Sequence, residues 1–378
     1  MCSAVAGEPF IPLFKGRIAP GAAAALAETL SSGQLATGPK VKAFEDKLGQ
    51  FVGNPHCVAT SDRAGALTIA LRLCGVTPGD DVMLSPLACL ATTMPIANLG
   101  AKPVWCDVDP DTGMLNPALL AARRTARTKA IIHYHWGGDV GPLGELQQVA
   151  VQLGIPLIAD ASGAFGAELQ GQKLGATGSD FTIYSFYAVS HLPAGDGGAL
   201  FCRSDEHAER ARQLRRFGID HKTFRLPNGD LNPQSDIPIA GYSMAMTDLT
   251  AALALEQFNE VEHTLARHRA NGRELAISTQ HLSGITPLSR GDEQRSAYWV
   301  FAFRAAHQER LIARLQAAGI GAQRLHVRND RYSCFPRSSA DELPGVEIFD
   351  RENLCVPCGW WVDEAALARI LECLQQTD

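Results

Sequence analysis

Short apolar segments alternate with helical segments over the first half of the chain. The apolar segments have the length and composition of buried strands, and the segments between them carry apolar residues at helical spacing. Strands are predicted at residues 56–60, 81–86, 102–109, 129–136, 156–163, 180–187 and 197–203, and helices at 20–52, 64–75, 90–100, 116–125 and 145–154. This alternation predicts an α/β fold, with a mostly parallel sheet and helices on both of its faces.

The alternation ends near residue 235, and a different pattern follows. Its predicted elements are a long helix at 247–276, a strand at 297–305, and helices at 307–319 and 363–375. At roughly 150 residues per domain, a length of 378 residues suggests two domains. We therefore expect a large α/β domain over residues 1–235 and a smaller α+β domain over residues 236–378.

The charge and the cysteines of the chain bear on its location and partners. The net charge is −6, and no block of Lys and Arg stands out, so neither a nucleic acid nor a membrane surface is an expected partner. Residues 1–16 lack the basic and apolar regions of a signal peptide. Cys355 and Cys358 have no second pair or nearby histidine that would suggest zinc, so no metal is expected. We expect a cytoplasmic protein with reduced cysteines.

Binding sites in open parallel sheets lie at the carboxyl ends of the strands. The segments that follow the predicted strands are therefore the places to look for functional residues. They span residues 60–64, 86–92, 133–139, 160–165 and 185–198.

Long stretches of the chain resemble the DegT/StrS family of pyridoxal-phosphate (PLP) enzymes, which are sugar aminotransferases. The matching stretches are LATGPKVKAFEDKLGQFVG, ATTMPIANLGAKPVWCDVDPDTGMLNP, IPLIADASGAFGAELQGQKLGATGSDFTIYSFY and GYSMAMTDLTAALALEQ. The resemblance implies a fold-type I PLP-transferase architecture, with a sheet of the seven-strand type and a smaller C-terminal domain. It also implies a homodimer in which both subunits complete each active site.

The resemblance also implies roles for particular residues. The family holds PLP through a lysine, a carboxylate on the ring nitrogen and a phosphate site at a helix N-terminus. Asp160 matches the carboxylate, and Ser185 matches a phosphate contact. The lysine falls on Ser190, and His191 takes the place of the following Asn. Because serine cannot form an imine, this replacement predicts the loss of Schiff-base chemistry.

Other family contacts are altered as well. The Ser-Gly-Thr phosphate loop falls on 62–64, or a one-residue gap places its serine on Ser61, and in both alignments the Gly-Thr is missing. Arg63 is a large residue there that could bind an anion through its guanidinium. The stacking aromatic residue falls on Cys89, and a His or Gln falls on Gly163. The Asn that the partner subunit contributes falls on Ser243. Several independent changes favour a natural loss of PLP chemistry over a single engineered substitution.

Three further groups are candidates for chemistry or binding. His133 and His135 lie on one face of a strand end, where they could act as a base, contact substrate, bind metal or only pack. Cys89 could be a nucleophile or could fill the space of the stacking ring. A triad of Ser190, His191 and Asp160 lacks the GxSxG turn of hydrolases.

The loop at 325–330 resembles a family segment that holds the nucleotide sugar. Its His326, Arg328 and Asn329 are therefore predicted substrate contacts, while the alternative is an ordered surface loop.

The patterns leave three hypotheses open. The leading one is a biosynthetic protein without Schiff-base transamination that binds a sugar nucleotide or a related small metabolite. The second is a sugar aminotransferase-like or dehydratase-like enzyme that binds PLP or pyridoxamine phosphate (PMP) noncovalently. The third is a non-catalytic subunit that pairs with an active aminotransferase paralogue. The sequence does not decide whether the chain is an enzyme.

Overall fold

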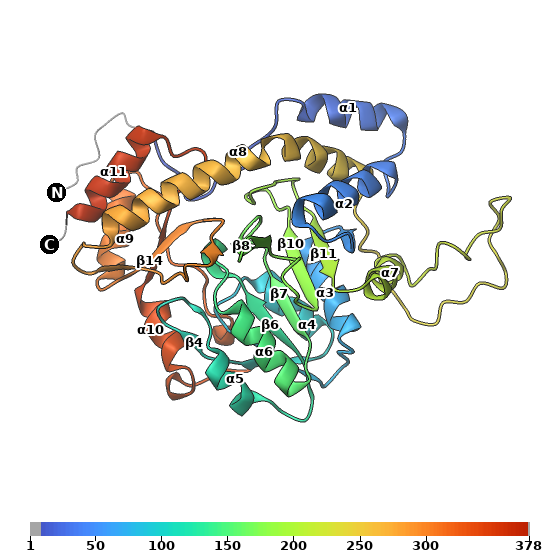
Figure 1. Ribbon diagram of the computed structural model, residues 1–378, viewed down its shortest axis with the longest axis horizontal. Coiled ribbons are helices and arrows are strands. Elements are labelled where there is room, and N and C mark those ends of the chain that lie inside the picture. The colour runs from blue at the N-terminus through green and yellow to red at the C-terminus, as the bar shows by residue number, and fades with distance from the viewer. Residues whose placement is uncertain (1–8, 377–378) are drawn as a thin grey trace.

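A seven-stranded sheet forms the centre of the structure, a computed structural model that describes residues 9–376 (Figure 1). The first eight residues of the segment tested for a signal peptide lie outside this range. The strands lie in the order β1-β11-β10-β7-β6-β2-β3. They span Cys57–Thr60 (β1), Gly198–Cys202 (β11), Phe181–Ser185 (β10), Leu157–Asp160 (β7), Thr128–Tyr134 (β6), Asp81–Leu84 (β2) and Lys102–Trp105 (β3).

Only β11 runs against the other strands. It pairs antiparallel with β1 and β10, while the pairs β10–β7, β7–β6, β6–β2 and β2–β3 are parallel. The prediction of a mostly parallel sheet is confirmed. The carboxyl ends of β10, β7 and β6 consequently meet at one edge, because Asp160 pairs with both Tyr134 and Ile183.

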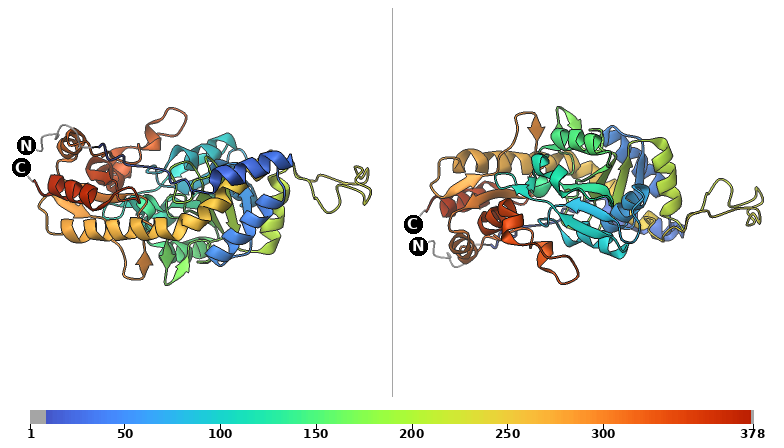
Figure 2. Two further views of the ribbon diagram at one scale, coloured as in Figure 1. Left: turned by 90° about the horizontal axis from the view of Figure 1, so that it is seen from above. Right: turned by 90° about the horizontal axis from the view of Figure 1, so that it is seen from below.

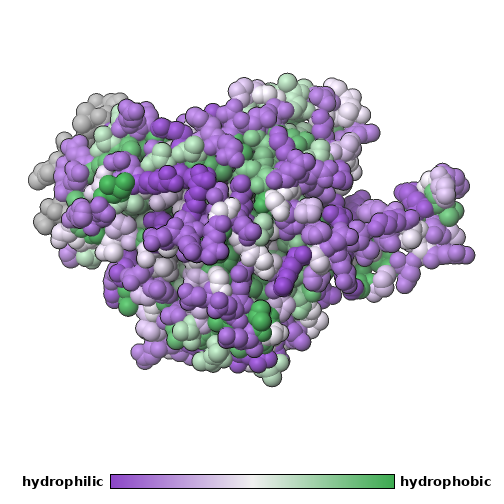
Figure 3. All heavy atoms as spheres, in the orientation of Figure 1, coloured by the Kyte–Doolittle hydropathy of each residue, from purple (hydrophilic) through white to green (hydrophobic). Residues whose placement is uncertain are grey.

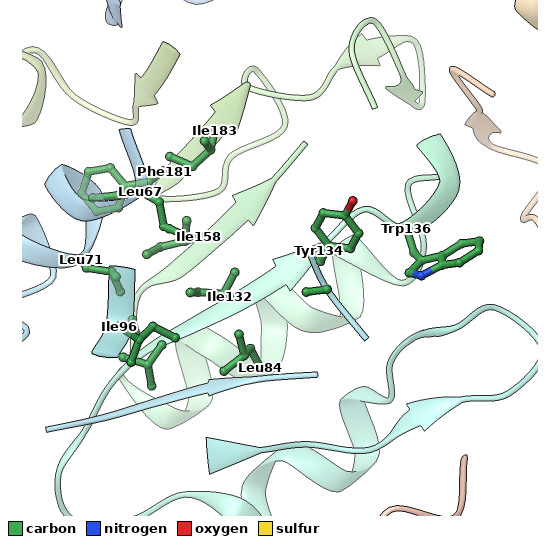
Figure 4. Close-up of a cluster of buried hydrophobic side chains, with 14 of the residues drawn as sticks. Leu67, Leu71, Leu84, Ile96, Ile132, Tyr134, Trp136, Ile158, Phe181 and Ile183 are labelled. Atoms are coloured by element: carbon green, nitrogen blue, oxygen red, sulfur yellow. The ribbon is translucent and has the colours of Figure 1, made fainter. Parts of the chain in front are cut away.

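Each face of the sheet buries its own apolar core. Ile132, Ile158 and Ile183 pack on one face with residues of helices α3 (Arg63–Leu73) and α4 (Leu90–Asn98) (Figure 4). Ile131 and Leu157 point to the other face. The helices that cover that face are α2 (Pro39–Val52), α5 (Pro117–Arg123), α6 (Leu143–Leu153) and α8 (Asp248–Thr279). Successive strand residues point to opposite faces of the sheet. Because both faces are covered by helices, nearly all residues of these strands are apolar.

The helices of this part match the predicted segments closely. They span Ala22–Ser32 (α1), Pro39–Val52 (α2), Arg63–Leu73 (α3), Leu90–Asn98 (α4), Pro117–Arg123 (α5), Leu143–Leu153 (α6) and Asp205–Leu214 (α7). The polar helix α7 was not predicted, because it has few apolar residues to mark a periodic stripe.

Helix α8, Asp248–Thr279, is 32 residues long and runs from the large sheet to a second, three-stranded sheet (Figure 1). That sheet has the order β12-β14-β15, with Ile285–Pro287, Phe301–Ala305 and Asn353–Val356. Helices α9 (Gln308–Ala317), α10 (Pro344–Glu352) and α11 (Glu364–Gln375) pack around it. Two small sheets complete the fold. One pairs β4 (Val108–Asp109) with β5 (Met114–Leu115), and the other has the order β13-β8-β9, with Gln294–Arg295, Glu168–Leu169 and Gln172–Lys173.

Residues 215–247 join α7 to α8. The ends of this segment lie against the large sheet, where Ala245 bridges Thr60, and its middle part, the arm, projects far from the body of the molecule (Figure 2). It contains only isolated bridges, such as the one between Arg225 and Leu231. Over residues 9–376, no helix combines the length and the apolar composition needed to cross a membrane.

Candidate functional site

A cavity of about 500 Å³ lies at the carboxyl edge of the large sheet, where the strand ends predicted the site. It is lined by Phe14, Asp62, Arg63, Ala64, Cys89, Ala91, Tyr134, Ser162, Gly163, Ser185, Tyr187, Val189, Ser190, Asp196, Trp299, Leu325 and His326. Within the described part of the chain, no lysine lines this cavity. Below we call it the pocket.

Arg63 is the cation of the pocket, and it is the first residue of helix α3. Its Nη1 donates a hydrogen bond to Ser162 Oγ at 2.7 Å, and Cys89 and Tyr134 also line the pocket and interact with its charge. Burial alone would lower the pKa of Arg63, but the Asp160 carboxylate and these neighbours raise it above its usual value. Arg63 is therefore a fixed positive charge.

Asp160 is fully buried at the end of β7, directly behind the pocket lining. Its Oδ2 accepts a hydrogen bond from Thr92 Oγ1 at 2.6 Å. Its Oδ1 accepts from the Ser162 backbone nitrogen at 3.1 Å and from the Ser162 hydroxyl. Ser162 therefore links the carboxylate of Asp160 to the guanidinium of Arg63 through one oxygen atom.

A second set of contacts leads from Arg63 to His326. The charge of Arg63 acts on Tyr134, and the Tyr134 hydroxyl lies 3.0 Å from His326 Nε2. Burial and the charge of Arg63 lower the pKa of His326 to about 3, so its ring is neutral. Which of the two atoms donates the hydrogen bond depends on the tautomer of this neutral ring.

Aromatic rings form one wall of the pocket. Phe14 stacks on Trp299 with ring centroids 4.6 Å apart, and Trp299 lies nearly parallel to His326 at 6.2 Å. Trp299 Nε1 donates to the Val189 carbonyl at 3.1 Å, which holds the ring against the turn that contains Ser190. Sequence reasoning missed Phe14 and Trp299, because both come from segments far from the strand ends.

The turn after β10 brings Ser185 and Ser190 to the pocket. The Ser190 hydroxyl donates to the Leu192 carbonyl at 2.9 Å, and the Ser190 backbone nitrogen donates to the Tyr187 carbonyl at 2.9 Å. Ser185 Oγ accepts from the Tyr187 backbone nitrogen at 3.3 Å. The Ser190 hydroxyl has therefore used its one hydrogen atom, and it can still accept a hydrogen bond from a ligand.

His191 points away from the pocket, although it follows Ser190 directly. Its Nε2 lies 3.1 Å from the Ala297 carbonyl, and its ring contacts His268 with centroids 4.6 Å apart. Burial and His268 lower its pKa well below the usual range. The structure therefore does not assemble Ser190, His191 and Asp160 into a triad.

His133 and His135 are also placed outside the pocket, fully buried and with ring centroids 4.5 Å apart. Both rings share one acceptor, because His133 Nε2 and His135 Nδ1 lie 3.1 and 2.9 Å from the Val140 carbonyl. Over residues 9–376, no group of three or more metal-ligating side chains includes them. Their side chains hold the turn after β6.

Of the loop at 325–330, the structure brings only Leu325 and His326 to the pocket. Arg328 is buried in ion pairs with Asp330, at 2.6 Å, and with Glu347. Asn329 Nδ2 donates to the Ala88 carbonyl at 3.0 Å and to Thr93 at 2.7 Å. Both side chains tie the loop to the protein and are not directed at the cavity.

Comparison with known proteins agrees with this geometry. The DegT/DnrJ/EryC1/StrS aminotransferase family matches residues 17–375. AtS13 from Actinomadura melliaura is 31% identical over 98% of this chain and 100% of its own, with a TM-score of 0.92. The sugar aminotransferase CalS13 from Micromonospora echinospora is 29% identical over 97% and 100%, with a TM-score of 0.91. Spr1654 from Streptococcus pneumoniae, solved in a PLP form, shares the fold at 24% identity over 97% and 98%, with a TM-score of 0.88.

The buried histidines predict how stability depends on pH. Burial lowers the pKa of His133 to about 4, and burial and the neighbouring His133 lower the pKa of His135 well below its usual value. Below about pH 6.5 the unfolded chain binds protons that the native chain does not, so the free energy of unfolding falls as pH falls towards 4. For His133 alone, the free energy of unfolding falls by about 3 kcal/mol once the pH is well below the native pKa of this residue.

Urea denaturation between pH 7 and pH 4 tests this expectation. The variant His133→Gln/His135→Asn keeps amide donors near Val140 but cannot take up these protons, so its stability should fall less steeply than that of the wild type. His281→Asn, at an exposed position, serves as the control and should change nothing. Equal slopes in the double variant and the wild type would contradict the assignment.

Proposed function

The chain belongs to the DegT/DnrJ/EryC1/StrS aminotransferase family, and we propose that it has lost Schiff-base transamination while still binding a sugar nucleotide or related small metabolite. The observation that carries the proposal is the composition of the pocket. Ser190 lines it where the resemblance expects the lysine, and no lysine lies among the other described lining residues. A hydroxyl group cannot form the imine that this chemistry requires.

The residues present do not fit PLP as the family holds it. The carboxylate that would hold the ring nitrogen, Asp160, already accepts hydrogen bonds from Thr92 and Ser162 and faces the charge of Arg63. Cys89 stands where a stacking ring is expected, and Gly163 replaces a His or Gln. These features favour the first hypothesis over the noncovalent PLP or PMP enzyme.

Borohydride reduction tests the loss of covalent cofactor binding. The protein is incubated with PLP, reduced, digested and mapped by mass spectrometry, and Spr1654 is treated in parallel as the positive control. We expect the pocket peptides to remain unlabelled, with only slight labelling of exposed lysines. Stoichiometric labelling of one lysine in the native protein would contradict the proposal.

The pocket supports binding of a sugar-sized ligand. The volume of about 500 Å³ is within the usual range for small-molecule sites. His326 offers a neutral imidazole ring that can form a hydrogen bond, and Trp299 offers a ring face beside it. A neutral hydrogen-bonding group beside an aromatic wall suits the oxygen atoms and the apolar face of a sugar ring.

Titrations with UDP-glucose and dTDP-glucose, followed by tryptophan fluorescence, test this ligand class. We expect saturable quenching with at least one probe. His326→Phe should raise Kd by about fivefold, because one hydrogen bond worth about 1 kcal/mol is lost. His263→Phe, at an exposed site on α8, is the matched control. No saturation with either probe, or unchanged affinity in His326→Phe, would count against the proposal.

The projecting arm supports the homodimer that the resemblance implies. Leu226, Leu231 and Ile237 expose 40%, 59% and 42% of their surface on it, and Figure 3 shows apolar groups among polar ones there. Apolar side chains on an extended arm are stabilised when a second copy covers them. Sedimentation velocity should give a dimer that Leu231→Asp weakens and Asp230→Asn leaves intact, whereas a wild-type monomer would refute this assembly.

A further inference from the structure

Two neighbouring residues, Asp62 and Arg63, occupy the positions that matter most for the charges of PLP. The cofactor has a ring nitrogen that pairs with a carboxylate and a phosphate that suits a helix N-terminus. In this chain Asp160 is the carboxylate and the start of α3 is the helix N-terminus. Asp160 is linked to the charge of Arg63 through Ser162, and the start of α3 is capped by the carboxylate of Asp62. We infer that Asp62 and Arg63 are a built-in substitute for the two charged ends of PLP, and that they exclude both PLP and PMP from the pocket.

Arg63 provides the positive end. Its Nη1 lies 2.7 Å from Ser162 Oγ, which in turn donates to Asp160. Both oxygens of Asp160 already accept hydrogen bonds, and the nearby guanidinium already balances its charge. A protonated pyridine ring would therefore have to displace Arg63 or share one carboxylate with a second buried cation, and both are unfavourable.

Asp62 provides the negative end. It is the N-cap of α3, a helix of 11 residues, and its Oδ1 accepts from the Gly65 backbone nitrogen at 2.7 Å. Its Oδ2 accepts from Ser61 Oγ at 2.8 Å. The carboxylate thus takes up the favourable interaction of the helix dipole that a phosphate would use, and it repels a second anion there.

A third feature closes the side of the pocket beside these residues. A Cβ atom added at Gly163 would lie 3.4 Å from the ring of Trp299, so this ring occupies the space into which a larger side chain would extend. Trp299 is fixed there by Phe14 and by the Val189 carbonyl. The cavity that remains has mostly apolar walls, which suit the apolar face of a sugar ring better than the charged groups of PLP.

The inference goes beyond the proposed function. Loss of the lysine excludes only a covalent bond to PLP, whereas Asp62 and Arg63 also exclude the reversible binding of PMP, which needs no lysine. Different experiments test the two claims. Labelling of a lysine by PLP would contradict the loss of covalent binding, and saturable binding of PMP would contradict the exclusion of the cofactor by Asp62 and Arg63.

Isothermal titration calorimetry with PMP is the experiment. The wild type is compared with Asp62→Ser/Arg63→Gly, which removes both charges from the pocket. The matched control is Arg203→Gly/Asp205→Ser, which removes one arginine and one aspartate whose side chains are 62% and 84% exposed outside the pocket. Circular dichroism and thermal unfolding establish that each variant is folded.

We expect no saturable binding of PMP by the wild type or the control up to about 1 mM, and a Kd at least tenfold lower in the pocket variant. Saturable binding by the wild type overturns the inference. A folded pocket variant that binds no better than the control overturns it as well.

A measurement on the wild type covers the case in which the pocket variant does not fold. Nitrogen-15 NMR of labelled arginine follows the side-chain N–H groups of Arg63, with Arg63→Lys used to assign them. We expect slowly exchanging N–H signals that stay unchanged when PMP is added. Rapid solvent exchange at Arg63, or a shift of its signals that saturates with PMP, overturns the inference.

Discussion

The pairing of Arg63 with Asp160 is the interaction on which the rest of the site depends. Asp160 is fully buried at the end of a central strand, and an unpaired carboxylate in such a place costs several kcal/mol. Arg63 supplies the opposite charge through Ser162, so the buried carboxylate is compensated by the chain itself. Together with burial, the charge of the same guanidinium keeps His326 neutral. One side chain at the start of α3 thereby influences both the carboxylate behind the pocket and the histidine in its wall.

The fold could be predicted from local patterns because its strands are short apolar runs and its helices carry periodic apolar faces. The strand ends also pointed to the edge where the pocket lies, and Arg63, Cys89, Ser185, Ser190 and His326 line it. The polar helix α7 and the projecting arm were not predicted, because neither has the apolar periodicity that marks an element.

The direction of a side chain at a strand end is harder to predict than its position in the sequence. The spacing of His133 and His135 correctly predicts that both lie on one face of the strand. Which face is directed at the pocket depends on how the strand pairs with its neighbours in the sheet, and one sequence does not show this. Arg328 and Asn329 lie in the expected loop, yet local partners such as Asp330 and Thr93 use their polar groups. Phe14 and Trp299 could not be paired with the pocket from one sequence, since their contacts join remote segments.

A crystal structure of the wild-type protein grown with PLP is the measurement that tests the central claim most directly. The account predicts that the Arg63 guanidinium remains against Ser162, with Asp160 behind it and no cofactor between Asp160 and Ser190. Electron density for PLP with its ring nitrogen on Asp160 and Arg63 displaced from that place, whether or not a lysine is joined to it, would contradict the account.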